Sequence, residues 1–318
     1  MFAESLRITG LAVTQILILG AIGYFLVRRN ILGQEGLNSL SRLAIEVTLP
    51  VLVFCQLIQE FRFNLYPDWW LFPLLSILVT VIGLAIGGLF TFFINGTQHR
   101  LQFLSLVTFQ NSGYLPLGLI ATLLPKEKAA PMLVYLFLFL LGFNLVMWSA
   151  GVYLLTFSRA KKFELGSFFS PPVIAIIFSL LLVFFGLQRF FGESLLKPLK
   201  MVGDCTLPLA MLVVGGNLAQ IRLKEVDKKA IFLMIIAKLA ILPLLGLLLI
   251  RQFKFPEMLG LLLLIELAMP PATSLSLITS HYKKEDLLIS QGVFYGHLFS
   301  IATIPLFLSL YFTLVMIK

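Results

Sequence analysis

Long apolar runs dominate this sequence and limit the folds that it can adopt. A run of roughly 20 apolar residues crosses about 30 Å of hydrocarbon as a helix, which makes all of its backbone hydrogen bonds internally. With 59% hydrophobic and only 12% charged residues, the chain is too apolar for a soluble domain, where charged residues make up about 25%. The sequence therefore predicts an all-α integral membrane protein.

Ten apolar spans fit the sequence, five in each half. The first five are predicted at 8–27, 37–59, 69–94, 101–124 and 132–157, and the second five at 172–187, 206–219, 230–250, 258–280 and 287–316. The seventh span is short and is expected to begin near Leu199. Residues 1–160 and 161–318 are thus predicted to form two five-helix units within a single membrane domain.

Proline positions recur between the two halves. Pro50 and Pro208 lie 158 residues apart, and Pro116 and Pro270 lie 154 residues apart. A near-constant offset indicates an internal repeat. Because each repeat has an odd number of spans, the second copy is expected to cross the membrane in the opposite orientation, which is the inverted-repeat plan of many secondary transporters.

Helix-breaking and polar residues interrupt the fourth and ninth spans, in QNSGYLP at 110–116 and AMPPATS at 268–274. Glycine and proline weaken or remove helical hydrogen bonds in a place where water is scarce. Paired broken helices in the two halves point to a substrate site near the bilayer midplane. The alternative interpretation is a pair of simple proline kinks that neighbouring helices satisfy.

The helix that restarts after each break presents an N-terminus with partial positive charge, so the predicted ligand is an anion such as a carboxylate. Two such half-helix ends can hold a carboxylate without a fully cationic pocket. The candidate binding residues are the polar and helix-breaking residues of both segments, namely Gln110, Asn111, Ser112, Gly113, Pro116, Pro270, Pro271, Thr273 and Ser274.

Several polar residues fall within other apolar spans. An ionisable residue costs roughly 2.5 to 3.5 kcal/mol at the centre of a membrane helix, so it needs a partner or a wet cavity. Lys238 and Glu266 lie in consecutive spans that enter from opposite sides. They are predicted to carry proton or charge coupling, or to form a structural ion pair. Glu46 is expected nearer the membrane surface, while Asn144 and His297 are by default contacts within the helical core.

Loop charges predict an orientation. Thirteen lysine and arginine residues lie in the loops of one predicted side, and ten lie on the other side. The positive-inside rule places the first group in the cytoplasm and both termini outside it.

The order of several short motifs resembles the auxin efflux carrier family, which includes plant PIN-FORMED auxin exporters and bacterial permeases for malonate, malate and related organic acids. The motifs are LSRLAIEVTLPVLVF at 40–54, QNSGYLPLGL at 110–119, FNLVMWSAGVYLL at 143–155, GDCTLPLAMLVVGGNLA at 203–219, and KLAILPLL and LAMPPAT in the second half. The resemblance covers essentially the whole chain. It implies the PIN-like or bile-acid symporter fold, with ten helices in two inverted repeats and the fourth and ninth helices broken and crossing.

The resemblance also implies site residues and a mechanism. Asn111, Pro116 and Pro270 match the family's crossover residues, and Asn144 falls where a polar residue of the fifth helix lines the plant proteins' pocket. The implied mechanism is an elevator-type movement of a transport domain against a scaffold. The long hydrophilic loop of the plant exporters is missing, so their control by phosphorylation is not implied for this chain.

The predicted function is secondary transport of a small organic anion, a carboxylate of the auxin or malate and malonate type, across the cytoplasmic membrane. Expected partners are the anion, membrane lipid, a proton or sodium ion, and a second copy in a homodimer; no cofactor, metal or nucleic acid is expected. A sodium-coupled symporter of the bile-acid type is the first alternative, and a channel or sensory protein is the second. An intramembrane enzyme is disfavoured because no HExxH motif or paired aspartates lie within a span.

Overall fold

The computed structural model describes residues 2–156, 169–221, 226–281 and 287–315, and its named elements are helices. The first half contains α1 (Phe2–Arg28), α2 (Gln34–Leu43), η1 (Ala44–Thr48), α3 (Leu49–Glu60), α4 (Leu71–Thr91), α5 (Thr97–Thr108), α6 (Tyr114–Leu123), α7 (Lys126–Val146), η2 (Met147–Gly151) and α8 (Val152–Thr156). The second half contains α9 (Pro171–Phe184), η4 (Leu187–Phe190), α10 (Glu193–Asp204), α11 (Thr206–Gln220), α12 (Lys228–Ile235), η5 (Ile236–Ile241), α13 (Leu242–Phe253), α14 (Glu257–Ala268), α15 (Ser274–His281) and α16 (Leu287–Leu314). The segments η1, η2 and η5 are single π-helical turns that join α-helices into longer ones.

Within the described ranges, seven helices are long and apolar enough to cross a membrane. They are Phe2–Arg28, Gln34–Glu60, Leu71–Thr91, Lys126–Leu155, Glu193–Gln220, Lys228–Phe253 and Leu287–Leu314. Each coincides with one predicted span, and the seventh predicted span begins earlier than expected, at Glu193. The sixth predicted span holds the shorter apolar helix Pro171–Phe184, and the fourth and ninth are each divided into two helices. The predicted span ends at 157 and 316, and the predicted boundary at 160, lie outside the described residues.

Large apolar side chains are exposed on the outer faces of these helices. On α1, Leu11, Ile18 and Phe25 are each more than half exposed, and Phe178 and Phe184 on α9 are exposed to a similar degree. Soluble monomers rarely leave such extended apolar surface in contact with water. The length and hydropathy of the helices, together with this apolar exterior, make the chain a multi-pass membrane protein.

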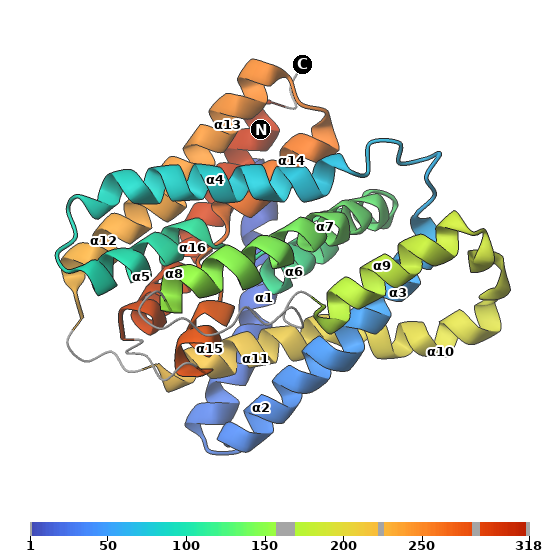
Figure 1. The fold of residues 1–318 in the computed structure, drawn as a ribbon, viewed down its shortest axis with the longest axis horizontal. Coiled ribbons are helices and arrows are strands. Elements are labelled where there is room, and N and C mark those ends of the chain that lie inside the picture. The colour runs from blue at the N-terminus through green and yellow to red at the C-terminus, as the bar shows by residue number, and fades with distance from the viewer. Residues whose placement is uncertain (1, 157–168, 222–225, 282–286, 316–318) are drawn as a thin grey trace.

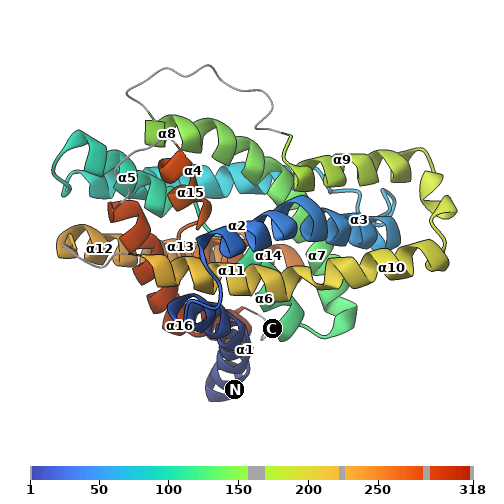
Figure 2. The same cartoon turned by 90° about the horizontal axis from the view of Figure 1, so that it is seen from below.

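Helices from the two halves pack against each other. α1 packs along α11 and α16, and α3 packs against α9 and α10. Within the first half, α4 packs against α5 and α7. In Figure 1 the α1–α2 and α4–α5 connections lie at the lower and left side, whereas the α3–α4, α9–α10 and α13–α14 connections lie at the upper and right side. Successive helices therefore run in alternating directions. Figure 2 shows the α2–α3 helix lying next to α10–α11, as their contacts indicate.

The contact between α1 and α11 is close because a glycine lies in it. A Cβ atom on Gly23 of α1 would overlap the backbone of Leu212 on α11. Small residues at such positions let membrane helices approach each other until their backbones touch. Replacing Gly23 with any other residue would therefore separate the two helices.

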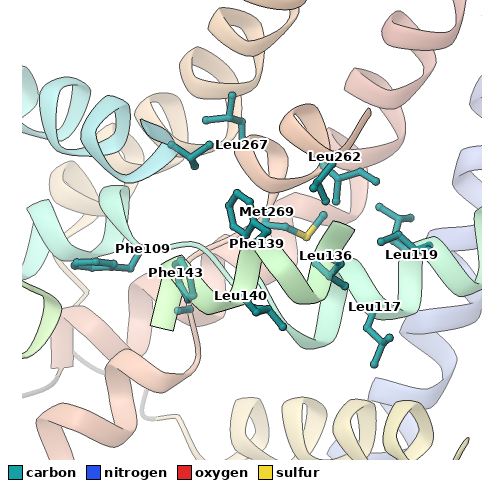
Figure 3. Packing of buried hydrophobic residues seen from close by; sticks show 14 of the residues in the cluster. Phe109, Leu117, Leu119, Leu136, Phe139, Leu140, Phe143, Leu262, Leu267 and Met269 are labelled. Atoms are coloured by element: carbon teal, nitrogen blue, oxygen red, sulfur yellow. The ribbon is translucent and has the colours of Figure 1, made fainter. Parts of the chain in front are cut away.

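The buried apolar core surrounds the two helix breaks. Phe109 and Met269, which begin the breaks, belong to the same buried cluster as the α7 residues Phe139, Leu140 and Phe143 (Figure 3). The polar groups of the breaks are consequently held in a region from which apolar side chains exclude most water, and they must find partners there.

Candidate functional site

The two interrupted spans meet at their breaks and pair with each other there. The backbone N–H of Asn111 donates to the carbonyl oxygen of Pro270 at 2.9 Å, and the N–H of Ala272 donates to the carbonyl oxygen of Phe109 at 2.9 Å. These bonds form a short antiparallel bridge between the breaks. Each break therefore satisfies part of the backbone that the other leaves unpaired, and the two segments hold each other in place.

Local sequence explains where the helices stop. Pro270 and Pro271 have no N–H and cannot continue α14, which ends at Ala268. On the other side, α5 ends at Thr108, where α4 approaches closely: a Cβ on Gly83 would lie 2.9 Å from the Cα of Thr108. Glycine at position 83 thus allows α4 to support the end of α5 directly beside the break.

A cavity of about 160 Å³ lies beside the crossing. Seven of the ten predicted binding residues line it, namely Gln110, Asn111, Ser112, Gly113, Asn144, Thr273 and Ser274. The first residues of α6 and α15 are in this wall, so the N-termini of both half-helices face the same space. Partial positive charge at both N-termini makes the space favourable for an anion.

The three predicted proline residues have a different role. None of Pro116, Pro270 and Pro271 is in the cavity wall: Pro116 is buried in the first turn of α6, and the other two belong to the backbone crossing. The starts of α6 and α15, at Tyr114 and Ser274, lie 160 residues apart. Pro116 and Pro270, 154 residues apart, thus lie at different points of the two breaks: Pro116 is in a helix, and Pro270 is in the link between helices.

Several polar side chains in the cavity wall have no protein partner. Both amide atoms of Gln110, the hydroxyl of Ser112 and the hydroxyl of Tyr114 are buried without a hydrogen bond to a described residue. Buried polar groups are normally hydrogen-bonded, so each such group in a native protein calls for an explanation. The hydroxyl of Tyr114 is thus available to a ligand in the cavity, whereas Gln110 and Ser112 also face the carboxyl group of Glu266.

Sequence reasoning missed part of this wall. Tyr114 and Trp148 lie within motifs that carry the family resemblance, yet neither was a candidate, while Leu49 and Pro172 come from the second and sixth spans. The motifs were a usable signal for the two aromatic residues. The motif at 40–54 includes Leu49 in the same way, whereas Pro172 lies outside the motifs and had no local signal.

Asn144 and His297 each have defined partners. Asn144 lines the cavity and donates its amide N–H to the carbonyl oxygen of Leu140, one helical turn earlier, at 2.8 Å. The amide nitrogen of Asn111 lies 3.4 Å from Nε2 of His297, whose Nδ1 lies 2.8 Å from the carbonyl oxygen of Val293. His297 is thus a satisfied core histidine, as expected, but it bonds to a predicted site residue.

Lys238 and Glu266 are buried together behind the crossing. Glu266 has no exposed surface, and its carboxylate faces Gln110, Ser112 and Lys238 without a hydrogen bond to a described residue. Lys238 is on η5, which packs against α5 and α14, and it makes no ion-pair contact among the described residues. The C-terminal ends of α5 and α14 carry partial negative charge, which favours a lysine nearby.

Glu46 pairs instead with Arg42 at 3.2 Å, with both side chains exposed.

A second cavity of about 360 Å³ lies between α1, α6, α11 and α16. His297 lines this cavity and Asn111 lines the smaller one, so their hydrogen bond stands between the two spaces. The remaining wall is almost entirely apolar, with residues such as Ile16, Leu119 and Met211.

An apolar multi-pass bundle, in which two broken helices meet at a buried polar cavity, has the construction of a membrane transport protein. The chain belongs to the family described as membrane transport protein, the auxin efflux carrier family, whose model matches it twice, at residues 10–166 and 156–308. It is also similar to Protein PIN-LIKES 4 of Arabidopsis thaliana, with 30% identity over 107 residues. That match covers 30% of this chain and 26% of the plant protein. The chain therefore matches about a quarter of this relative's length.

Proposed function

We propose that this protein is a secondary transporter that carries a small organic anion, a carboxylate, through the site at the helix crossing. The observation that carries the proposal is the meeting of two half-helix N-termini in one cavity, beside the unpaired side chains of Gln110 and Ser112. The partial positive charge of the two N-termini, together with the amide and hydroxyl donors of the wall, would replace the water that a carboxylate loses there.

The proposed architecture is ten spans in two inverted repeats. The seven long helices are completed by α9 and by the broken pairs α5–α6 and α14–α15. Element starts support the repeat: α2 and α10 begin 159 residues apart, α5 and α14 begin 160 apart, and α7 and α16 begin 161 apart. The two matches of one family model to successive parts of the chain support it as well.

The proposed mechanism is an elevator-type movement. The helices that carry the crossing would slide against a scaffold of α1, α2–α3 and α9–α11. Both cavities lie between these two groups: the smaller is walled by Leu49 and Pro172 on the scaffold side, and the larger by α1 and α11. A movement along this boundary would change which cavity the crossing opens to, and would thereby give alternating access.

Lys238 and Glu266 are proposed to balance charge or carry a proton rather than to bind sodium. A sodium site needs several oxygen ligands, and Glu266, a carboxyl group buried beside the crossing, lies near the amine of Lys238. The sodium-coupled alternative is separated from this proposal by counterflow measured with and without a sodium gradient: rates should be equal if Lys238 supplies the positive charge.

We further propose the cytoplasmic membrane as the location, with both termini outside the cytoplasm.

A thermal-shift screen tests the proposed site. Purified protein is heated with a series of small monocarboxylates and dicarboxylates, and the measurement is repeated with Asn111→Ala. Asn217→Ala is the matched control, since Asn217 lies on α11 and in the wall of neither cavity. At least one anion should raise the melting temperature of the wild type and of the control, and should do so less in Asn111→Ala. If no anion stabilises the wild type, or if all three proteins respond equally, the proposed site is wrong.

A further inference from the structure

Helices α1 and α16 are joined at one place and enclose the larger cavity beyond it. The hydroxyl oxygen of Thr9 on α1 lies 3.0 Å from the hydroxyl oxygen of Ser309 and 3.2 Å from the carbonyl oxygen of Pro305, both on α16. Beyond this contact the cavity wall includes side chains from residues 13–24 of α1 and from residues 294–304 of α16. Since α6 and α11 also pack against α1 (Figure 2), the cavity is an elongated space between four helices.

The cavity opens to the outside of the bundle between α1 and α16. Ala21 on α1, and Leu298 and Ile301 on α16, are in the cavity wall and are also exposed. The nearby side chains of Ile18 and Phe299 on the same helices are exposed apolar groups as well. Because both helices are long and apolar enough to cross the membrane, the opening faces the hydrocarbon of the bilayer, where lipid chains take the place of water.

The wall of the cavity offers little to a polar ligand. Among its described residues, Tyr24, His297 and Ser300 carry polar side chains. Ser300 donates to the carbonyl oxygen of His297, and both ring nitrogens of His297 already have partners. Apolar cavities in proteins stay dry and accept apolar molecules, and close-packed interiors rarely leave a space of about 360 Å³ empty. The occupant that fits is therefore an apolar group.

The dimensions of the cavity fit one lipid chain. From Val13 to Tyr24 the wall extends along α1 for about 16 Å, at 1.5 Å per residue. One leaflet of a bilayer contributes about 15 Å of hydrocarbon, which is half of the 30 Å core. Over this length the volume corresponds to a mean cross-section of about 22 Å², whereas a helix with its side chains is about 10 Å across and would not fit.

Positive charge lies where the cavity reaches the membrane surface. Residues four apart share one face of a helix, so Arg28, the last residue of α1, continues the face that carries Tyr24. Arg28 and Arg29 are exposed and make no ion pair with a described residue. Glu35 at the start of α2 is the nearest acidic residue in sequence, and it leaves an excess of positive charge. Basic residues at this level attract the phosphate of anionic lipids, and tyrosine is common there too.

We infer that the larger cavity is a binding site for an anionic phospholipid, with one acyl chain between α1 and α16 and the phosphate at Arg28 and Arg29. The site is separate from the proposed anion site and does not depend on transport. Met269 and His297, beside the crossing, belong to the cavity wall. A bound chain fills the space next to them, so the crossing can open to this cavity only after the chain has moved.

Photo-crosslinking tests the position of the chain. The purified protein in detergent is mixed with a phosphatidylglycerol that carries a diazirine near the methyl end of one chain, and labelled residues are identified by peptide mass spectrometry. Labels are expected on Leu119 and Met211, which line the cavity and are only 2% and 1% exposed, out of reach of lipid on the outer surface. If labels occur only on exposed residues, whether a second copy covers the opening or the cavity stays empty, the inference is overturned.

A variant that narrows the opening gives an independent test. Ala21→Trp places a large side chain at the opening, and Ala85→Trp is the matched control, since Ala85 is an exposed alanine of α4 in the wall of neither cavity. Labels on Leu119 and Met211 should be lost in Ala21→Trp and kept in the control. Equal labelling of the two variants, with equal melting temperatures, would overturn the inference. If Ala21→Trp does not fold, the map of labels on the wild type decides.

The headgroup contact is tested with phosphatidylcholine that carries the same chains and the same diazirine. Wild-type protein should prefer phosphatidylglycerol, and the preference should fall by about fivefold in Arg28→Gln, because a single basic residue near an anionic lipid contributes a factor of this size. Arg251→Gln, at the exposed end of α13, is the control and should keep the preference. Equal labelling of the wild type by the two lipids would overturn the contact of the phosphate with Arg28 and Arg29.

Discussion

His297 determines which end of the Asn111 amide is available to a ligand. A backbone carbonyl can only accept, so the 2.8 Å contact with Val293 requires the proton of His297 to be on Nδ1. In the neutral imidazole Nε2 is then an acceptor, and Asn111 must turn its NH₂ group toward it, at 3.4 Å. One N–H of Asn111 is used in this way, which leaves the second N–H and the carbonyl oxygen for the cavity.

Replacement of His297 by leucine removes the acceptor and frees the amide to rotate. A neutral hydrogen bond of this kind contributes about 1 kcal/mol, and 3.4 Å is at the long end of the range. Since 1.4 kcal/mol is a factor of ten, the apparent affinity for the anion should fall by about fivefold in His297→Leu. His297→Gln keeps an acceptor and should remain within about twofold of the wild type.

Two measurements check this reasoning, one functional and one spectroscopic. The first is KM for anion uptake in proteoliposomes, with kcat measured in the same experiment as a control for the amount of folded protein. The second is nitrogen NMR with labelled histidine, which is practical because the chain has only three histidines. The spectrum should show His297 with its proton on Nδ1. A proton on Nε2, or equal KM values for the leucine and glutamine variants, would refute the proposed orientation of Asn111.

Three further predictions concern other groups. Lys238→Met should lower the free energy of unfolding, because it removes the basic group that acts on the buried Glu266, and adding Glu266→Gln should recover part of that loss; additive losses in a double-mutant cycle would show that the two do not interact. Gly23→Ala should lower the melting temperature through overpacking that costs about 1–3 kcal/mol, whereas Gly10→Ala on the same helix has open space and should not lower it. Tyr114→Phe should leave thermal stability unchanged, since its hydroxyl has no described partner, and should weaken anion binding if that hydroxyl donates to the ligand.

Local sequence was sufficient to predict the membrane class and the position of the breaks. A helix that crosses hydrocarbon needs about 20 apolar residues. Whether a segment meets this requirement depends on its own sequence alone. Proline and glycine likewise act only on the backbone of their own segment, where they weaken or remove helical hydrogen bonds. For this reason the interruption of the fourth and ninth spans was predicted correctly, and the structure places most of the predicted polar residues in one cavity wall.

The exact place of each proline within its break was not predictable from the sequence. Proline has no required position within a break: Pro116 begins α6, while Pro270 lies in the extended link. The starts of α5 and α14, and of α6 and α15, are each 160 residues apart.

The sequence by itself determined that this chain crosses a membrane several times, that two spans are broken, and which polar side chains lie beside the breaks. Only the tertiary structure decided how these parts meet. The bonds of Asn111 to Pro270 and to His297 join segments about 160 and 186 residues apart, and the apolar wall beside them is assembled from helices of both halves. Such contacts depend on how whole helices pack, because an apolar side chain in an apolar span carries no local mark of whether it faces lipid, another helix or a ligand.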